Sequence, residues 1–530
     1  MTILTANRYR ENSTTQKTLG SVYTPPRAAA ALVRWAVRAP SDSVLDPSCG
    51  DGVFLDATRE RLRQLGNRKP QCTGVDVDAE AARSARAVCR DFFEWAPAAQ
   101  QFDAVVGNPP FIRSHLFPET SRGLAFSQMR QMGLTPSRLM STWAPFLAIS
   151  CRLLNQDGRL ALVIPEELLH VGYAEGLRQY LLARFRRIVV CFPNGDLFPS
   201  VQQAVVLLLC DNDPTQPSGL QTIGFREMES GPPYPTHPAP PWNWFHKWTH
   251  LFLSDNERGT VSQSFPELDW SRFSEYGRVE VGVVTGYNEF FVVSRAQAEA
   301  LGGTDLCTPI VSSARDLQGI EFDGTDFQRL ADDGRPCWLI DTAEPKDRLP
   351  PPLRNYLEAG EEQGINKRFK CRMRDPWYSV PSVWPADALL LRQAGHVPRL
   401  VHLVKICTST DTIHRVRWHR PAHAKRHVVG FLNTWTLIAC ELMGRSYGGG
   451  VLELMPGEAN AIPLPPPLPS LDRVFARVDR LVRKQQLQKA IEIVDKSVTP
   501  DSISSVQYKS ARRILLKLIA RRKNKQNGNH

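Results

Sequence analysis

A short polar turn that follows an apolar strand carries the clearest chemistry in this sequence. The expected strand ends at Gly107 and leads into Asn108, Pro109, Pro110 and Phe111. Each proline fixes its own φ angle and lacks an N–H group, so the turn is stiff and leaves carbonyl groups unpaired. The Asn108 side-chain oxygen and the Pro109 carbonyl could accept both hydrogens of an amino group. Phe111 could offer an aromatic face to the flat ring that carries this amino group. The same residues are also explained by a purely structural role, in which two prolines end the strand and the phenylalanine packs in the core.

A glycine-containing loop follows an earlier strand and suits a small ligand. Gly50 and Gly52 permit a tight turn and a close approach of the backbone to the ligand. The loop also holds two carboxylates, Asp46 and Asp51, which disfavour a phosphate and favour an ammonium or sulfonium group. The loop comprises Asp46, Pro47, Ser48, Cys49, Gly50, Asp51 and Gly52.

Further polar residues lie at the ends of other predicted strands and at the start of a predicted helix. Asp76 ends the next strand, about two dozen residues after the glycines, where a carboxylate can bind ribose hydroxyls. Asp91 could accept a hydrogen bond from an adenine amino group beside the aromatic wall of Phe92. Thr24 precedes an alanine-rich helix whose free N–H groups could receive a carboxylate. An ordinary helix cap explains Thr24 equally well.

The elements that must position these residues alternate in type. This alternation of apolar strands with helices predicts an α/β, Rossmann-like, mostly parallel sheet covered on both faces, with its ligand at the carboxyl ends of the strands. All the candidate residues lie at such ends. Strands are expected near 43–46, 72–78, 88–89, 102–107, 159–164, 188–192 and 203–209, and helices near 27–37, 53–65, 139–154 and 174–185.

Composition narrows the class of protein. The chain has 530 residues, 42% of them apolar, and a formal net charge of +11, so two or three domains and a polyanionic partner are expected. Eleven cysteines are scattered without a C-x-x-C pair, which favours reduced thiols and a cytoplasmic location. The polar N-terminus does not resemble a signal peptide, and no apolar run approaches the ~20 residues that span a membrane.

These motifs together resemble a known family. In their order and spacing they are similar to the gamma-class N6-adenine DNA methyltransferases of the TaqI type, over roughly the first 200 residues. The resemblance implies a class I methyltransferase sheet and S-adenosylmethionine as cofactor. The motifs that carry it are Tyr23-Thr-Pro-Pro26, Asp46-Pro-Ser-Cys-Gly-Asp-Gly52, Asp76, Asp91-Phe92 and Asn108-Pro-Pro-Phe111.

The resemblance also implies a role for each residue. Thr24 and the loop of residues 46–52 would hold the methionine part of the cofactor, Asp76 the ribose, and Asp91 with Phe92 the adenine. Residues 108–111 would be the catalytic motif, which acts on a target adenine flipped out of duplex DNA. Phe111 and Phe198 would stack on that base. Restriction-modification or related defence is implied, with double-stranded DNA and a separate restriction or defence component as partners, and with the enzyme acting on DNA as a monomer.

The second half of the chain is expected to read DNA. A proline-rich stretch at 231–241 suggests a methyltransferase domain at 1–245, a mixed α/β target-recognition domain at 246–465 and a helical basic segment at 466–530. A hairpin is expected over 280–293. Its turn would supply Thr285, Gly286 and Asn288 to DNA, as in the target-recognition domains that the segment resembles, although turn and core packing explain it equally well.

A basic stretch and a helical tail complete the second half. Arg415, Arg417 and Trp418 suit phosphate contact and groove insertion. The histidines around them lack a ligand spacing, so no metal is expected. Helices are predicted near 471–482 and 510–522, and the basic residues of the second could add affinity for DNA or form a solvated face.

Two other functions stay open at this point. Asn-Pro-Pro followed by an aromatic residue also occurs in enzymes that methylate protein glutamine or RNA amino groups, because an amide or amino acceptor poses the same chemical problem. The large basic C-terminal half weighs against the small protein-glutamine enzymes. A non-catalytic DNA-binding subunit with a methyltransferase fold is the second alternative, against which the intact Asn108–Phe111 motif and the loop glycines weigh.

Overall fold

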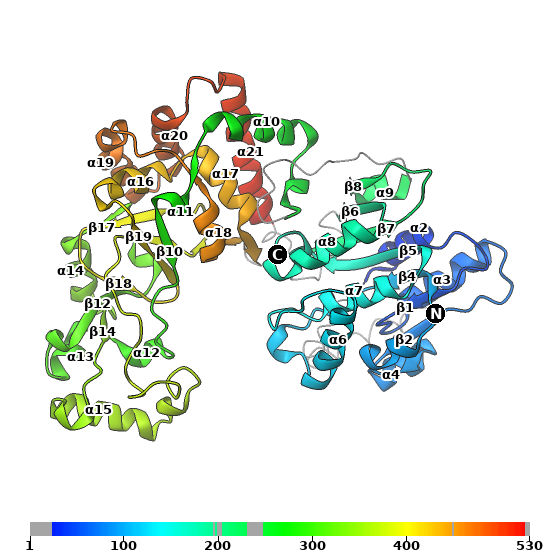
Figure 1. The fold of residues 1–530 in the computed structure, drawn as a ribbon, viewed down its shortest axis with the longest axis horizontal. Helices are drawn as coiled ribbons and strands as arrows, with labels where there is room; N and C mark the ends of the chain where they lie inside the picture. Colours follow the sequence, from blue (N-terminus) through cyan, green and yellow to red (C-terminus); the bar gives the residue numbers. More distant parts are fainter. Residues whose placement is uncertain (1–23, 194–196, 199–203, 231–246, 448–449, 525–530) are drawn as a thin grey trace, which may run out of the picture. The chain divides into compact units, whose positions relative to one another are not determined.

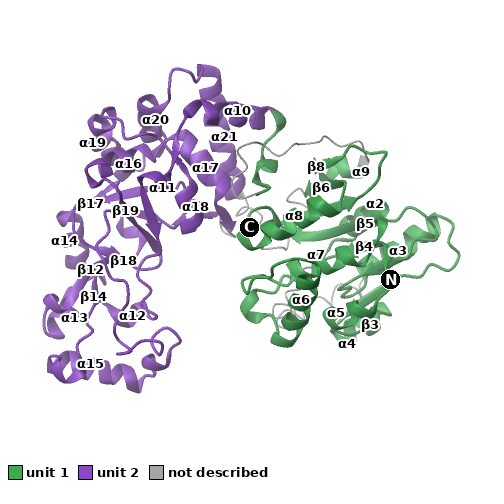
Figure 2. Ribbon diagram, viewed as in Figure 1, with its two compact units in different colours: residues 1–255, 525–530 green, residues 256–524 purple. Residues whose placement is uncertain are grey.

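The protein is described from a computed structural model. The structure describes residues 24–193, 197–198, 204–230, 247–447 and 450–524. The chain divides into two compact units, one of residues 1–255 with 525–530 and one of residues 256–524 (Figure 2). Each unit is described by itself. No helix among the described residues is long and apolar enough to cross a membrane.

The first unit is built on an eight-stranded sheet (Figure 1). Its strand order is β3-β2-β1-β4-β5-β7-β6-β8, and every neighbouring pair is parallel except those that β7 makes with β5 and β6. The predicted mostly parallel α/β sheet is therefore confirmed. The strands are β1 (Val44–Asp46), β2 (Thr73–Asp76), β3 (Val88–Cys89), β4 (Phe102–Gly107), β5 (Leu154–Pro165), β6 (Arg187–Phe192), β7 (Val205–Asp211) and β8 (Gly219–Gly224).

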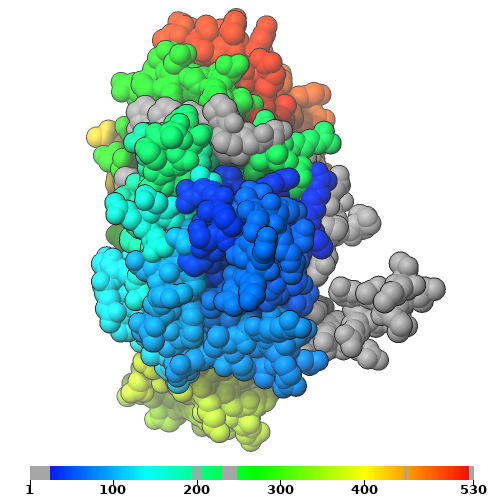
Figure 3. Space-filling view, turned by 90° about the vertical axis from the view of Figure 1, so that its right-hand side faces the viewer, coloured from blue at the N-terminus to red at the C-terminus, as the bar shows by residue number. Residues whose placement is uncertain are grey.

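Helices cover both faces of this sheet. Successive strand residues point to opposite faces, so Val105 belongs to one apolar cluster and Val106 to the other. The first cluster includes residues of α5 to α8, and the second includes residues of α2, α3 and α9. Residues of α2 to α4, drawn in blue, form much of the surface in Figure 3. The helices are α2 (Pro26–Ala36), α3 (Val53–Gln64), α4 (Ala79–Ala85), α5 (Phe92–Trp95), α6 (Glu119–Gln131), α7 (Trp143–Arg152), α8 (Glu175–Arg184) and α9 (Phe225–Ser230).

The strand order reverses between β1 and β4. From β1 the chain builds outward through β2 to β3, and it then returns to place β4 on the other side of β1. Open α/β sheets bind ligands at the carboxyl ends of the strands at such a reversal. The loop after β1 and the turn after β4, which hold most of the candidate residues, both start there.

The second unit is mixed α/β, as predicted. Its main sheet has the order β10-β19-β15-β17-β13, and a four-stranded sheet has the order β11-β14-β12-β18. The strands are β9 (Ser271–Arg272), β10 (Gly277–Glu280), β11 (Val292–Val293), β12 (Cys307–Val311), β13 (Glu321–Phe322), β14 (Trp338–Ile340), β15 (Ala388–Leu391), β16 (Gln393–Ala394), β17 (Leu400–Leu403), β18 (Thr408–Ser409), β19 (Ile413–Trp418), β20 (Arg445–Tyr447), β21 (Val451–Glu453) and β22 (Pro463–Leu464).

The hairpin predicted over 280–293 is wrong. β10 pairs with β19, and β11 pairs with β14, so the two runs enter different sheets. Between them lies the short helix α12 (Asn288–Phe291). Packing explains the difference, because Phe290 stacks on Tyr356 with ring centroids 4.5 Å apart, and Phe291 contacts Trp377 edge-on.

The C-terminal helices belong to the second unit. The two predicted ones are confirmed as α19 and α21, and α20 lies between them. Arg522 of α21 pairs with Glu441 of α17 at 2.8 Å, and residues 256–524, which span most of the segments predicted as 246–465 and 466–530, form one compact unit. The longer helices of this unit are α10 (Asp255–Leu268), α14 (Gly324–Asp332), α15 (Pro351–Glu362), α17 (Thr434–Met443), α19 (Ser470–Arg483), α20 (Leu487–Val498) and α21 (Ser505–Asn524).

Candidate active site

The turn after β4 is joined to two other predicted segments. The Asn108 side-chain Nδ2 donates a hydrogen bond to Thr24 Oγ1 at 3.0 Å. The Ser48 hydroxyl donates to the Asn108 carbonyl at 3.3 Å. Thr24 is buried, and Tyr23 lies outside the described residues. The structure thus brings together the start of α2, the loop after β1 and the turn after β4.

Thr142 fixes the other end of this turn. Its hydroxyl donates to the Pro110 carbonyl at 2.5 Å and accepts from the Ile112 N–H at 3.0 Å. Its own N–H donates to the Ile112 carbonyl at 3.0 Å. Thr142 is only 2% exposed, so these bonds are shielded from water.

Sequence reasoning missed Thr142. It occupies the cap position before α7, where a threonine hydroxyl normally accepts from the helix N–H groups. Here the side chain makes no such cap bond, because its hydroxyl serves the turn. A threonine before a long apolar helix was the available signal, and it pointed to an ordinary helix cap.

The Pro109 carbonyl differs from its neighbours. The Asn108 carbonyl accepts from Ser48, and the Pro110 carbonyl accepts from Thr142. Within the part of the chain that the structure describes, no group donates to the Pro109 carbonyl. A rigid turn that leaves this oxygen available fits the predicted acceptor of an amino group.

The glycine loop is fastened to the end of β2 through Asp76. The Gly50 N–H donates to Asp76 Oδ2 at 2.8 Å, and the Asp78 N–H donates to Asp76 Oδ1 at 2.9 Å. Gly52 has a φ of +93°, and a Cβ there would lie 3.1 Å from the Ala85 Cβ. The two bonds orient the Asp76 carboxylate, whose oxygens keep further capacity to accept from a ligand.

Asp46 is a buried carboxyl at the reversal of strand order. It is 0% exposed, and its Oδ1 accepts from the Ser48 N–H at 3.2 Å. Its Oδ2 has no hydrogen-bond partner among the described residues. Burial is the main cause that raises the pKa of Asp46 to about 8, and the charges of Asp76 and Asp51 raise it further, while the Ser48 bond opposes them.

Gly107 allows β4 to pass this carboxyl. A Cβ at Gly107 would lie 2.6 Å from Asp46 Oδ1 and 3.2 Å from Pro47 Cδ. A side chain at that distance would force either the Asp46 carboxyl, which is bonded to the Ser48 N–H, or the strand to move. The close approach of the two strand ends therefore depends on glycine at this position.

Asp91 and Phe92 form a wall at the end of β3. Asp91 Oδ1 accepts from the Phe93 N–H at 2.7 Å, and Asp91 Oδ2 accepts from the Ser121 hydroxyl at 2.5 Å. Phe92 is buried and stacks on Phe146, with ring centroids 4.8 Å apart and planes 10° apart. Both residues are thus ordered by their own contacts.

The two predicted stacking residues share an apolar cluster. Phe111 is half-buried and packs against the clusters on both faces of the sheet. Phe198 is buried within the cluster that includes α2 and α3. The turn thus places the Phe111 ring at the carboxyl edge of the sheet, beside Asn108.

Two of the expected DNA-contacting residues in the second unit are buried. Arg415 is buried, and its guanidinium donates to the carbonyls of Val281 at 3.1 Å and Ser382 at 2.7 Å. The buried Trp418 ring lies 5.1 Å from the Phe273 ring and 4.8 Å from the His427 ring, centroid to centroid, and stacks on both. Both side chains are thus engaged within their own unit, and their DNA contacts stay predictions.

The turn at 285–288 is also partly structural. Thr285 is buried and donates from its hydroxyl to the Asn288 side-chain oxygen at 2.5 Å, so its hydroxyl shapes the turn itself. Gly286 and Asn288 are half-buried, and Arg417 is exposed. Their DNA contacts stay predictions. Among the described residues, no group of three or more His, Cys, Asp or Glu could hold a metal ion.

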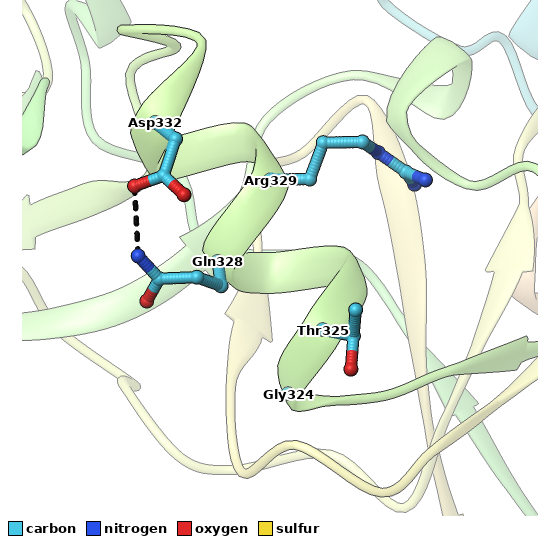
Figure 4. A pocket seen from close by; sticks show the side chains of 5 residues that line it. All are labelled: Gly324, Thr325, Gln328, Arg329 and Asp332. Atoms are coloured by element: carbon cyan, nitrogen blue, oxygen red, sulfur yellow. Dashed lines mark hydrogen bonds between the residues drawn. The ribbon is translucent and has the colours of Figure 1, made fainter.

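A surface hollow of about 440 Å³ lies along α14 of the second unit (Figure 4). Gln328 donates to Asp332 at 2.7 Å on one side, while Arg329 extends away from them. Arg295 also pairs with Asp332 at 3.2 Å. Gln328 and Asp332 are thus engaged in hydrogen bonds and an ion pair, and none of the lining residues was a predicted site residue. Its lining is Gly324, Thr325, Gln328, Arg329 and Asp332.

Strand order and site together define the class of protein. A parallel sheet that reverses between β1 and β4, with a glycine loop after β1 and a carboxylate at the end of β2, is a class I S-adenosylmethionine-dependent methyltransferase fold. Residues 56–197 match the family model of the Eco57I restriction-modification methylases, and residues 245–499 match the C-terminal domain of Type II methyltransferase M.Eco57I. The chain belongs to this gamma-class family of restriction-modification methylases.

Individual relatives agree with this assignment. The chain is 23% identical over 399 residues to Type II methyltransferase M.AccI of Acinetobacter calcoaceticus, covering 70% of each chain. It is 24% identical over 471 residues to M.XamI of Xanthomonas campestris pv. amaranthicola, covering 84% of this chain and 85% of that protein. The solved structure of the Type IIL restriction-modification enzyme MmeI with DNA shares the fold, with a TM-score of 0.56 and 12% identity over 94% of this chain and 75% of that one.

Proposed function

We propose that this protein transfers a methyl group from S-adenosylmethionine to the 6-amino group of an adenine flipped out of duplex DNA. The observation that carries the proposal is the rigid turn at 108–111, which is bonded to Thr24, Ser48 and Thr142 and leaves the Pro109 carbonyl available. Membership of a restriction-modification methylase family and a net charge of +11 support DNA as the substrate.

The residues at the carboxyl edge of the sheet fit the cofactor. When bound, S-adenosylmethionine supplies an electrophilic methyl group on a positively charged sulfur. The buried Asp46, with an oxygen that lacks a partner among the described residues, suits a cationic ligand. Asp76, oriented by the Gly50 N–H, would bind the ribose hydroxyls. Thr24 and residues 46–52 would hold the methionine part, and Asp91 with Phe92 would border the adenine.

The turn would act on the target amine. The lone pair of an adenine 6-amino group is delocalised into the ring, which makes the nitrogen a poor nucleophile. Two acceptors on its hydrogens, the Asn108 side-chain oxygen and the Pro109 carbonyl, would draw the nitrogen toward tetrahedral geometry and localise that pair. The bond from Asn108 Nδ2 to Thr24 sets which way the amide faces. Holding two reactants in contact can contribute ~7–11 kcal/mol.

The base must leave the duplex to reach this turn. Flipping costs a few kcal/mol of lost stacking, which enzymes recover by stacking the extruded base on aromatic side chains. Phe111 and Phe198, in one apolar cluster beside the turn, would supply those faces. We further propose that the protein acts on DNA as a cytoplasmic monomer and works with a separate restriction or defence component.

A methyl-transfer assay with several acceptors tests this function. The purified protein is incubated with methyl-labelled S-adenosylmethionine and, in parallel, with duplex DNA, transfer RNA, ribosomal RNA and a release-factor protein. We expect label in duplex DNA alone. Label in an RNA or in protein glutamine, with none in DNA, would replace the proposal with one of those activities, and no transfer to any acceptor would favour a non-catalytic DNA-binding subunit.

A variant separates catalysis from cofactor binding. Asn108→Ala removes one of the two proposed acceptors, so we expect methyl transfer to be abolished while S-adenosylmethionine still binds in calorimetry. The control is Asn355→Ala, a change of the same kind at an exposed position of α15 in the second unit. Loss of cofactor binding together with transfer would show that the assignment of roles between the turn and the loop is wrong.

A further inference from the structure

A basic loop with two exposed apolar side chains follows α15 of the second unit. The basic loop, residues 366–374, holds five basic residues and no acidic one. Phe369 is 63% exposed and Met373 is 71% exposed. Large apolar groups so exposed, and set among cations, are typical of a surface that binds a partner. The five basic residues are Lys367, Arg368, Lys370, Arg372 and Arg374.

The basic loop is held in place by contacts on both sides of Phe369. Ile365 and Cys371 are buried in the apolar cluster beneath it. Arg374 donates to the Val284 carbonyl at 2.7 Å and to the Thr285 carbonyl at 2.9 Å. The Arg368 guanidinium lies 3.7 Å from the centroid of the Tyr287 ring. These contacts fix the position of the loop, so its exposed residues are held at the surface.

Gly286 explains how closely the loop approaches the turn at 285–288. Gly286 has a φ of +88°, and a Cβ there would lie 3.0 Å from Lys370 Cβ and 3.1 Å from Cys371 Sγ. A side chain at this position would press against the basic loop. The turn at 285–288, which was predicted to contact DNA, thus packs directly against the basic loop.

Two cations lie near the exposed ring of Phe369. The Arg372 guanidinium lies 5.4 Å from the ring centroid, and the Lys370 Nζ lies 5.7 Å from it. Duplex DNA presents the matching chemistry, because phosphates flank each groove and apolar side chains can insert between base steps. Cations beside an exposed apolar side chain therefore fit duplex DNA as the partner. An apolar protein surface fits less well, because it offers no anions to the cations.

We propose that the basic loop contacts duplex DNA, with Lys370 and Arg372 on phosphates and with Phe369 and Met373 against the bases. The inference rests on the proposed function in one respect, since it takes duplex DNA as the substrate. It adds a contact that neither the turn at 108–111 nor the exposed Arg417 supplies. In addition, it assigns Gly286 a positioning role through its contact with Lys370 and Cys371.

Binding measurements at several salt concentrations test the phosphate contacts. Affinity of the full-length protein for a fluorescent duplex is measured by anisotropy. Each phosphate contact contributes about 0.9 to the slope of log Kd against log salt. The double variant Lys370→Ala/Arg372→Ala should therefore bind more weakly and lower that slope by about 1.8. The matched control, Arg473→Ala/Arg477→Ala, removes the same charge from exposed positions of α19 and should leave the slope nearly unchanged.

A second variant tests the apolar contact. Contact between an aromatic side chain and a base is worth roughly 5- to 100-fold in affinity, so Phe369→Ala should weaken binding within that range. Because no charge is removed, its salt slope should equal that of the unchanged protein. Phe369→Trp keeps an aromatic face and should restore most of the affinity. All five side chains changed in the loop and control variants lie at the surface, and melting curves would verify that each variant folds.

The outcomes separate the loop from the proposed function. If the unchanged protein methylates DNA while both loop variants bind duplex with unchanged affinity and slope, the loop proposal is refuted and the function stands. If both loop variants lose affinity and the double variant also lowers the slope, but no methyl group reaches DNA, the loop contact is supported and the function fails. Equal losses in the α19 control would also overturn the loop proposal, because the effect would then follow net charge alone.

Discussion

Thr142→Val tests whether the turn at 108–111 depends on a contact from outside the motif. The substitution keeps the size and branching of the side chain but removes the hydroxyl. That hydroxyl donates to the Pro110 carbonyl and accepts from the Ile112 N–H. At about 1 kcal/mol for each hydrogen bond, the loss amounts to ~2 kcal/mol. A unit of this size shifts its melting temperature by about 2–4 °C per kcal/mol, so we expect a decrease of about 4–8 °C.

The effect on catalysis should be larger than the effect on stability. A displacement of about 1 Å in a reacting group can cost about 100-fold in rate. We therefore expect Thr142→Val to lower kcat by roughly 10- to 100-fold. Cofactor affinity should stay close to that of the unchanged protein, since Thr142 contacts none of the residues proposed to bind the cofactor. Single-turnover methyl transfer to duplex DNA gives the rate, and calorimetry gives the cofactor affinity.

Thr142→Ser is the matched control, because it keeps the hydroxyl and loses only a methyl group. It should retain most of the rate. The reasoning would be refuted if Thr142→Val transferred methyl groups at the unchanged rate, or if Thr142→Ser were as impaired as Thr142→Val. In the second case, packing of the methyl group beside Trp143 would explain the role of Thr142, and the hydrogen bonds to the turn would not.

Two further predictions concern buried charges. In the folded protein the pKa of Asp46 is raised from 3.8 to about 8, so the carboxyl increasingly destabilises the fold as the pH rises through that interval. The melting temperature of Asp46→Asn relative to the unchanged protein should therefore increase from pH 5 to pH 8, and a constant difference would contradict this. The Arg522 guanidinium is paired with Glu441 and donates to the Gly450 and His396 carbonyls. Arg522→Gln should therefore lower the free energy of unfolding by about 3–5 kcal/mol. Chemical denaturation measures that loss, and an equal loss in the exposed control Arg513→Gln would contradict it.

The site motifs were predictable because their geometry is local. A proline pair fixes the turn after β4, and two glycines fix the loop after β1, whatever surrounds them. The order of apolar runs likewise indicated a mostly parallel sheet. Thr142 could not be found in this way, because its bond to Pro110 joins positions 32 residues apart. Its role appears only when α7 packs beside the turn.

Burial of charged residues was the main feature that sequence reasoning could not supply. Arg415 stands in a basic stretch, yet its guanidinium is satisfied by carbonyl groups of Val281 and Ser382. Trp418, three residues later, is stacked within the core of the same unit. The basic loop was not predictable either. Its apolar and basic residues alternate over 369–374 as in a strand, but the chain forms turns there, which bury Cys371 and expose Phe369 and Met373.

The nucleoside composition of treated DNA tests the central claim most directly. Duplex DNA that lacks prior methylation is incubated with the purified protein and S-adenosylmethionine, digested to nucleosides and analysed by mass spectrometry. The turn at 108–111, as the binding site for an adenine amino group, predicts N6-methyladenine, and none with Asn108→Ala. Methylated cytosine in place of methylated adenine, or unmodified DNA after complete incubation with a folded, cofactor-binding protein, would contradict the account.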